Sequence, residues 1–242
     1  MSSSSSQTSL FGAPVPHWRP PVVPEGAALS GQYSFMVPLS APAHAVSLYQ
    51  AYEGQDHVWD YLPYGPYPSV AQYEGWVREN AGRPDPFFYA IQNRESDRWE
   101  GVASYLRVAP AAGSIEVGHI NYSPALQQTR AGTEAMYLMM RWAFEAGYRR
   151  YEWKCNALNI PSRRAAQRLG FSFEGVFRQA DVVKGRNRDT AWFAAIDAEW
   201  PALKSAFETW LAPQNFDKAG RQVKRLGDLT APARVASDPV LT

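Results

Sequence analysis

The sequence predicts an α/β protein of the α+β kind, in which helices cover both faces of a mixed β-sheet. Hydrophobic residues make up 45% of the 242 residues and charged residues 19%, which is enough apolar material for a sizeable core. Segments with helical periodicity alternate with segments of strand character. Hairpin strands come first and strand–helix–strand units follow, an order typical of a sheet with antiparallel and parallel pairs.

The first half of the predicted domain contains two helices and three strands. Ser69 is a suitable N-cap for the second helix. The breaker segment 110–113 separates the second strand from the third. The helices are predicted at residues 43–52 and 69–80, and the strands at 87–92, 100–108 and 114–122.

The second half alternates strands and helices more strictly. Apolar residues recur at helical spacing between residues 132 and 146. A helix between two strands is a crossover that joins parallel strands, so strands 114–122 and 151–155 are predicted to be parallel. The remaining predicted elements are a helix at 159–169 with Asn159 as its cap, a hairpin of strands 175–183 and 189–196, and a helix at 199–211.

The two ends of the chain differ in composition from the segment between them. Residues 1–30 are rich in serine and proline, which predicts an extended or disordered arm. Residues 212–242 are polar and mildly basic, which predicts a partly ordered tail. The intervening residues 31–211 are predicted to form one domain.

Composition argues against several classes of function. The formal net charge of +1 provides no bulk attraction to nucleic acid or to an anionic membrane. With one cysteine, Cys155, and four scattered histidines, neither an intramolecular disulfide nor a metal site is predicted. The N-terminus lacks the apolar run of a secretory signal, and no apolar run approaches the ~20 residues that span a bilayer. We expect a soluble, cytoplasmic protein.

Two segments have the pattern of a ligand site. Residues 114–135 read as a strand, a polar loop and a helix start, and the unpaired N–H groups of a helix start suit a pyrophosphate. Taken alone, this segment is better explained as an ordinary connection. In the second segment, residues 159–171, Asn159 either caps a helix or offers its side-chain amide to a ligand.

Several short motifs occur in a fixed order along these segments. They are Glu116-Val117-Gly118, the run Gln127 to Ala135 (QQTRAGTEA), Asn159-x-x-Ser162, Leu169-Gly170-Phe171, and Phe173-Glu174-Gly175 followed by Arg178, Asp189 and Trp200. The ordered set resembles the GNAT acetyltransferases, and among them the ribosomal-protein N-terminal acetyltransferases, over roughly residues 33–211. The resemblance implies a twisted, mixed sheet of about six to seven strands with helices on both faces and one parallel pair splayed apart at one end.

The resemblance also implies that acetyl-CoA is the co-substrate. Its pyrophosphate would lie at the start of helix 132–146, and its pantetheine would run between the splayed strands. The residues so implied are Ile120, Tyr122, Gln127, Gln128, Thr129, Arg130, Ala131, Gly132, Thr133, Asn159 and Ser162.

Two positions depart from the family pattern. Arg130 stands where the family loop usually has its first glycine, and three alternatives remain: contact with a CoA phosphate, a solvent-facing side chain, or weakened CoA binding. We expect CoA binding to be retained. Ala166 replaces the tyrosine that protonates the leaving thiolate in many members. Ser162 is then the nearest candidate acid, unless it is simply a capping serine.

The implied reaction is direct transfer from the thioester to a deprotonated amine. A backbone N–H near Ile120 to Tyr122 would polarise the thioester carbonyl. Glu116 is the first candidate proton acceptor and His119 the second. A merely exposed glutamate and a core histidine are the alternatives for these two residues.

The loop between the first two predicted helices is unusually aromatic. In the family fold it borders the acceptor pocket, so its aromatic residues, together with His119, are candidates for an acceptor-binding wall. An aromatic cluster that simply covers the sheet explains them equally well. The aromatic residues are Trp59, Tyr61, Tyr64 and Tyr67.

The sequence therefore predicts an acetyl-CoA-dependent N-acetyltransferase that acts on a protein N-terminus or a small-molecule amine. Arg130 and the missing tyrosine leave open a catalytically inactive acyl-CoA-binding sensor. A peptide-binding module that uses only the aromatic loop is a third alternative. The sequence does not distinguish a monomer from a homodimer.

Overall fold

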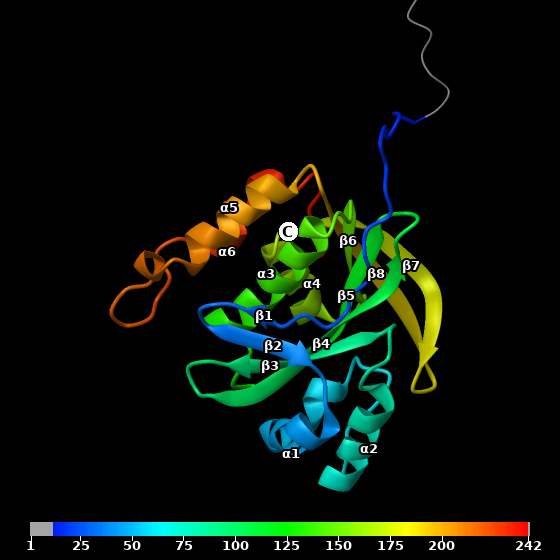
Figure 1. Ribbon diagram of the computed structural model, residues 1–242, viewed down its shortest axis with the longest axis vertical. Helices are drawn as coiled ribbons and strands as arrows, with labels where there is room; N and C mark the ends of the chain where they lie inside the picture. The colour runs from blue at the N-terminus through cyan, green and yellow to red at the C-terminus, as the bar shows by residue number, and fades with distance from the viewer. Residues whose placement is uncertain (1–11, 242) are drawn as a thin grey trace, which may run out of the picture.

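The computed structural model describes residues 12–241, which form an eight-stranded mixed sheet with helices on both faces (Figure 1). The strands lie in the order β1-β2-β3-β4-β5-β6-β8-β7. They are β1 (Leu29–Ser30), β2 (Ser34–Pro38), β3 (Phe87–Asn93), β4 (Arg98–Ala109), β5 (Ser114–Tyr122), β6 (Arg150–Asn156), β7 (Ser172–Val183) and β8 (Arg186–Ile196). The helices are α1 (Ala41–Tyr52), α2 (Val70–Asn80), α3 (Arg130–Glu145), α4 (Ile160–Arg168), α5 (Trp200–Leu211) and α6 (Leu226–Thr230), with short 3₁₀ helices η1 (Asp56–Trp59), η2 (Pro213–Asn215) and η3 (Ala231–Ala233). The predicted mixed sheet is confirmed, with eight strands instead of six to seven.

The predicted parallel pair is also confirmed. β5 pairs in parallel with β6 from Ser114, opposite Arg150, to Val117, opposite Trp153. β5 continues to Tyr122 and β6 to Asn156 without further pairing between them, so the two strands separate at their carboxyl ends. All other strand pairs are antiparallel.

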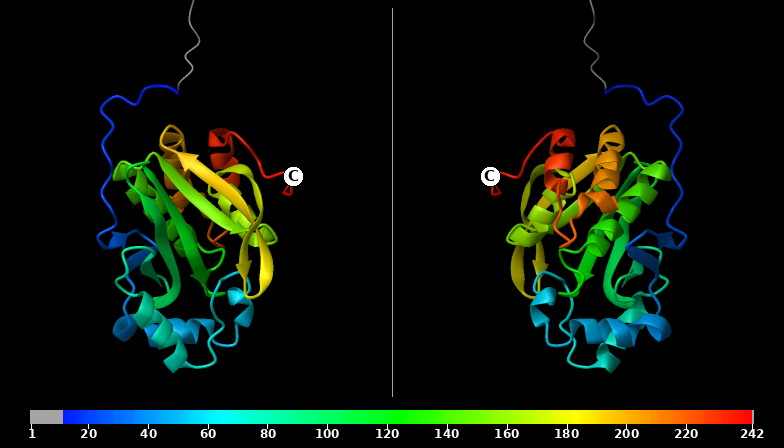
Figure 2. Two further views of the ribbon diagram at one scale, coloured as in Figure 1. Left: turned by 90° about the vertical axis from the view of Figure 1, so that its right-hand side faces the viewer. Right: turned by 90° about the vertical axis from the view of Figure 1, so that its left-hand side faces the viewer.

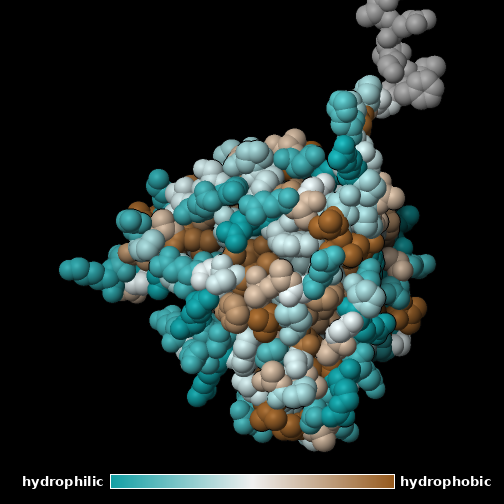
Figure 3. All heavy atoms as spheres, viewed as in Figure 1, coloured by the Kyte–Doolittle hydropathy of each residue, from teal (hydrophilic) through white to brown (hydrophobic). Residues whose placement is uncertain are grey.

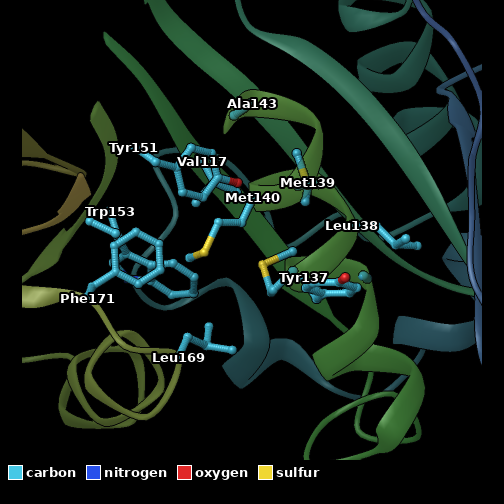
Figure 4. Close-up of a cluster of buried hydrophobic side chains, with 14 of the residues drawn as sticks. Val117, Tyr137, Leu138, Met139, Met140, Ala143, Tyr151, Trp153, Leu169 and Phe171 are labelled. Atoms are coloured by element: carbon cyan, nitrogen blue, oxygen red, sulfur yellow. The ribbon is translucent and has the colours of Figure 1, made fainter. Parts of the chain in front are cut away.

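Two hydrophobic clusters lie on opposite faces of the sheet. α1 and α2 cover one face, where Leu48, Tyr73 and Val77 are fully buried (Figures 1 and 2). α3, α4 and α5 cover the other. Figure 4 shows Met140 of α3 pointing towards the aromatic side chains of Trp153 and Phe171. The sheet is therefore a layer between two helical layers, as the composition and periodicities predict.

The helix starts agree with their capping residues. Ser69 accepts a hydrogen bond from the N–H of Gln72, and Asn159 accepts one from the N–H of Ser162, as predicted. α3 begins at Arg130 with Thr129 as its cap, two residues before the predicted start at Gly132. The first two residues of α3 precede its apolar periodicity, so the pattern alone places the start too late.

The N-terminal arm is extended and docked from residue 12, whereas residues 1–11 lie outside the described part of the chain. The Trp18 indole donates to the carbonyl of Ala111, and the Tyr148 hydroxyl donates to the carbonyl of Val22. At the end of the arm, β1 pairs with β2, the first strand of the domain, at the edge of the sheet. These two strands are short and precede a helix directly, and the sequence pattern does not reveal them.

The segment after α5 packs against the domain. Leu226 is fully buried, and Arg163 of α4 binds Asp238 through Nε–Oδ2 at 2.6 Å, with both side chains inside. The loop between η2 and α6 projects from the body, and Figure 3 shows hydrophilic side chains over it. The polar composition thus does not reveal that this segment packs on the domain through Leu226 and Asp238.

Within residues 12–241, no helix is long and apolar enough to cross a membrane. The same residues contain no group of three or more His, Cys, Asp or Glu side chains arranged to hold a metal ion.

Candidate active site

A β-bulge interrupts β5 where it leaves β6. Ser104 of β4 pairs with Gly118, but Val102 pairs with Asn121, so β5 contains one residue more than its partner. His119 takes up the additional length with a φ of 49°. A bulge leaves backbone groups without ladder partners and bends the strand. The bulge therefore places backbone groups near Ile120 beside the gap between β5 and β6.

The loop before α3 forms a second cluster of backbone donors. Gln128 has a φ of 59°, which turns the chain into the helix. Thr129 caps α3, and its hydroxyl donates to the carbonyl of Leu126 while accepting from the N–H of Gly132. Among residues 12–241, the N–H groups of Gln128, Arg130 and Ala131 have no hydrogen-bond partner. Such N–H groups at a helix start, together with the helix dipole, form an anion site.

Gly132 is held by close packing. A Cβ atom there would lie 2.6 Å from the carbonyl oxygen of Leu126 and 3.0 Å from the Tyr122 ring. The Tyr122 hydroxyl also donates to the Gly132 carbonyl at 2.9 Å. The glycine therefore allows the loop to fold onto the first turn of α3, while its own N–H is used by the Thr129 cap.

Arg130 neither blocks this anion site nor extends freely into solvent. Its guanidinium lies 4.7 Å from the centre of the Tyr33 ring and 4.8 Å from that of Phe216. Two aromatic contacts of this kind fix the position of the guanidinium. The structure thus adds to the alternatives for Arg130 a cation–π contact with Tyr33, before β2, and with Phe216 of the C-terminal segment.

The start of α4 lies at the end of β6, across the gap from the bulge. The Ser162 hydroxyl accepts a hydrogen bond of 3.0 Å from the indole N–H of Trp153. It also bonds to the thiol of Cys155, a buried group whose pKa is raised by burial. Asn159 is occupied as the helix cap. Ala166 is fully buried in the core, so no side chain replaces the absent tyrosine from that position.

Glu116 lies on the face of the sheet opposite α3, at the centre of a row of ion pairs. Its carboxylate is 2.7 Å from Arg107 Nη1 and 2.9 Å from Lys154 Nζ. Lys154 also pairs with Glu152 at 2.7 Å and lies 3.7 Å from the centre of the Trp192 ring. Burial raises the pKa of the Glu116 carboxyl, although the hydrogen bonds from Lys154 and Arg107 act to lower it.

Sequence reasoning did not identify Lys154 as part of this site. A signal was available, because Glu152 and Lys154 alternate along β6 with the core residues Tyr151, Trp153 and Cys155. Two charged side chains on one face of a central strand require partners. Glu116, the residue opposite Glu152 on β5, provides one.

His119 lies on the same face and contacts the aromatic loop. Its Nδ1 is 3.0 Å from the Tyr64 hydroxyl, and the two rings are stacked. Burial, with the nearby charges of Arg107 and Arg188, lowers the pKa of His119 to about 4. The ring is therefore neutral at pH 7, and Nδ1 shares a hydrogen bond with the hydroxyl of Tyr64, whose own pKa is raised by burial.

The four aromatic residues of the loop divide into two pairs. Trp59 is buried, and its ring contacts those of Tyr67 and Tyr73 in the cluster beneath α1 and α2. Tyr64 reaches His119, and the Tyr61 hydroxyl donates to the carbonyl of Leu158 just before α4. Trp59, Tyr64 and Tyr67 thus belong to the aromatic cluster that covers the sheet, and Tyr64 and Tyr61 in addition contact His119 and the segment before α4.

The tip of the β7–β8 hairpin closes this side of the gap. Lys184 donates from Nζ to the carbonyl of Trp59 at 2.9 Å, and Figure 2 shows the hairpin tip beside the loop that follows α1. One candidate site is therefore surrounded by the splayed strands, the loop before α3, the start of α4 and the aromatic loop.

Comparison with known proteins identifies the family to which this arrangement belongs. The family model described as an acetyltransferase (GNAT) domain matches residues 35–172. A GCN5-related N-acetyltransferase from Brucella melitensis is 43% identical, with a TM-score of 0.88 over 90% of this chain and 100% of that one.

The chain belongs to the GNAT acetyltransferase family.

Other solved GNAT structures share the fold. A GNAT-family protein from Chromobacterium violaceum is 40% identical, with a TM-score of 0.76 over 82% of this chain and 100% of that one. The ribosomal L7/L12 α-N-protein acetyltransferase RimL, solved in complex with coenzyme A, is 21% identical, with a TM-score of 0.61 over 71% of this chain and 99% of RimL. At that identity, the likeness to RimL shows the fold alone. No curated protein sequence matches the chain.

The GNAT fold accounts for how the predicted site residues are distributed. Those predicted to contact CoA come from β5, the loop before α3 and the start of α4, which converge at the splay. The N–H groups of Gln127, Gly132 and Thr133 are bonded within the loop and helix, so only part of the predicted loop offers free donors. Glu116 and His119 lie on the other face, where Glu116 pairs with Lys154 and His119 contacts Tyr64.

Proposed function

We propose that this GNAT protein transfers an acetyl group directly from acetyl-CoA to a primary amine, on a protein N-terminus or a small molecule. The observation that carries the proposal is the position of the β5 bulge. It lies in the gap between the splayed strands, with the free N–H groups of the α3 start on one side and His119 and Tyr64 on the other. This arrangement provides separate places for an anionic co-substrate and for an amine.

The start of α3 would hold the pyrophosphate of acetyl-CoA. The N–H groups of Gln128, Arg130 and Ala131 would donate to phosphate oxygens, and the pantetheine would lie between β5 and β6. Holding both substrates in one site converts a bimolecular reaction into an effectively unimolecular one. Backbone N–H groups at the bulge would stabilise the negative charge that develops on the carbonyl oxygen.

Two side chains, Glu116 and Ser162, are proposed to transfer protons, one on each side of the gap between β5 and β6. Glu116 is proposed as the proton acceptor, acting through water, because burial raises its pKa. His119 is a poor acceptor since its pKa is lowered to about 4, and its proposed role is to position Tyr64 and the amine as a neutral hydrogen-bonding group. Ser162 is proposed to protonate the leaving thiolate. Its oxygen accepts from Trp153, and its hydroxyl proton would exchange the bond with Cys155 for one to the thiolate.

Two measurements test this function. Calorimetric titration with acetyl-CoA tests co-substrate binding, and thiol release with a panel of N-terminal peptides and small amines tests turnover. We expect binding and turnover, with Ser162→Ala and Glu116→Gln each lowering kcat by about 10² or more. Tight binding without turnover on any amine would instead favour the inactive acyl-CoA sensor. Absence of binding would refute both.

A further inference from the structure

A pocket of about 300 Å³ lies between α4 and the C-terminal segment, apart from the splayed strands. The residues that matter here are Arg164, Gln167 and Arg168 of α4, and Gly227, Asp228 and Arg234 of the segment after α5. Three guanidinium groups and one carboxylate line this space, so positive charge is in excess by two.

The arginines of this pocket are not neutralised by the protein. No carboxylate of residues 12–241 forms an ion pair with Arg164, Arg168 or Arg234, whereas Arg163, the neighbour of Arg164, is paired with Asp238. Arg234 Nε is buried and has no hydrogen-bond partner among the same residues. A buried donor without a partner is costly, and a bound anion would satisfy it.

Burial adds to this cost. It lowers the pKa of Arg168 and of Arg234, which means that the surroundings disfavour their charge. The other contacts of the two side chains are with neutral groups. Arg234 Nη1 donates to the carbonyl of Gln167, and Arg168 stacks 5.0 Å from the centre of the Trp210 ring. Packing thus fixes both guanidinium groups in place while leaving their charge without a counter-ion.

Arg168 connects the pocket to the start of α3. Its Nη1 donates to the Thr133 hydroxyl at 3.2 Å, and Thr133 lies in the first turn of α3, two residues after Ala131, whose N–H is free like that of Arg130. The arginine pocket therefore lies next to the proposed pyrophosphate site at the start of α3.

We propose that this pocket binds the 3′-phosphate of the CoA nucleotide, an inference that rests on the proposed use of acetyl-CoA. A phosphate monoester carries a charge of about −1.5 to −2 at pH 7, which matches the excess of two positive charges. Guanidinium groups bind such oxygens with paired, charge-assisted hydrogen bonds. Arg234 comes from the segment after α5, so this segment contributes directly to the co-substrate site.

The test compares CoA with dephospho-CoA, which differs only in lacking the 3′-phosphate. Dissociation constants are measured by calorimetry for the full chain and for Arg164→Gln, Arg234→Gln and the control Arg221→Gln. Arg221 is exposed, is paired with Asp217 and lies outside the pocket, so its substitution controls for lost positive charge. Arg164 forms no ion pair and is exposed, so its substitution should not affect folding.

We expect the full chain to bind CoA about tenfold more tightly than dephospho-CoA. Arg164→Gln and Arg234→Gln should each reduce this ratio towards one by weakening CoA alone, and Arg221→Gln should preserve it. Equal affinities of the full chain for the two nucleotides would refute the proposal. The proposal would also be refuted if the variants lose the same affinity for CoA and for dephospho-CoA. It would be refuted likewise if inorganic phosphate binds in the pocket while the full chain binds both nucleotides with equal affinity. Failure of both nucleotides to bind would instead refute the acetyl-CoA function on which the inference rests.

Discussion

Gly31 lies directly against the carboxylate of Glu134. A Cβ atom at Gly31 would be 2.2 Å from Oε2 of Glu134, so any larger residue would displace the carboxylate from its present position. The carboxylate accepts hydrogen bonds from the N–H groups of Gln32, Tyr33 and Ser34 at 2.6–2.9 Å. The glutamate of the TEA motif is therefore a structural residue that attaches the turn between β1 and β2 to α3.

We first predict that Glu134→Ala destabilises the protein by about 3 kcal/mol or more, because several buried backbone donors would lose their acceptor. Urea unfolding at pH 7 measures this. Glu145→Ala is the matched control, since Glu145 is half exposed on the same helix and forms only a 3.4 Å pair with Lys204. Equal stability of the two variants would show that Glu134 does not hold the turn.

The second prediction concerns Gly132. Gly132→Val should weaken acetyl-CoA binding strongly, because its Cβ would force the carbonyl of Leu126, and with it the loop before α3, to move. Gly75→Val in α2 introduces the same side chain with nothing within 4 Å of its Cβ and should leave affinity unchanged. Calorimetry gives the affinities, and circular dichroism reports whether each variant is folded. A folded Gly132→Val variant with normal affinity would contradict the proposed pyrophosphate site.

The third prediction separates the two roles of the aromatic loop. Tyr64→Phe removes only the hydroxyl that contacts His119, so we expect kcat/KM for the amine to fall about tenfold with acetyl-CoA affinity unchanged. Tyr61→Phe also removes one hydroxyl from the loop, but one that contacts the carbonyl of Leu158, and it should have a smaller effect. Equal kinetics for both variants would exclude the Tyr64–His119 contact from acceptor binding.

Trp59 should behave differently from Tyr64. It is buried among Tyr52, Tyr67 and Tyr73, so Trp59→Ala should cost about 3–5 kcal/mol of stability. Thermal unfolding tests this expectation. A stable Trp59→Ala variant would show that the cluster under α1 and α2 tolerates a large cavity.

The fifth prediction is a dependence of stability on pH. The pKa of His119 is about 4 in the folded protein and 6.5 in the unfolded chain, so the unfolded state binds the proton first as the pH falls. Stability present above pH 6.5 should therefore decrease between pH 6.5 and 4, by roughly 3 kcal/mol for this residue. Urea unfolding at pH 7 and pH 5 should show a smaller loss for His119→Gln than for the exposed control His57→Gln. Equal losses would indicate that His119 is not buried as a neutral ring.

Much of the central fold follows from local sequence patterns. Ser69 and Asn159 have the side chains that cap helices, and the crossover between β5 and β6 determines their parallel pairing. The strands β1 and β2 are different, because their pairing depends on Glu134, a residue about 100 positions away. Short edge strands have too few residues for a periodic pattern to appear.

The site is less predictable than the fold for the same reason. The motif residues mark the loop before α3 and the start of α4, since these contacts are local. The row formed by Arg107, Glu116 and Lys154 joins three strands, and the Arg163–Asp238 pair spans 75 residues. Neither has a local signature, so each becomes visible only when the strands and the C-terminal segment are in place.

The two bridges between the aromatic loop and the second half of the chain have a mechanical consequence. The Tyr61 hydroxyl donates to the carbonyl of Leu158, and Lys184 donates to the carbonyl of Trp59. These two hydrogen bonds connect the aromatic loop with the segment before α4 and with the β7–β8 hairpin, across the splayed strands. Widening the gap would break both of them. If acyl transfer takes place there as proposed, the width of a rigid frame limits the acyl group, and we expect rates to fall steeply from acetyl to propionyl and butyryl thioesters.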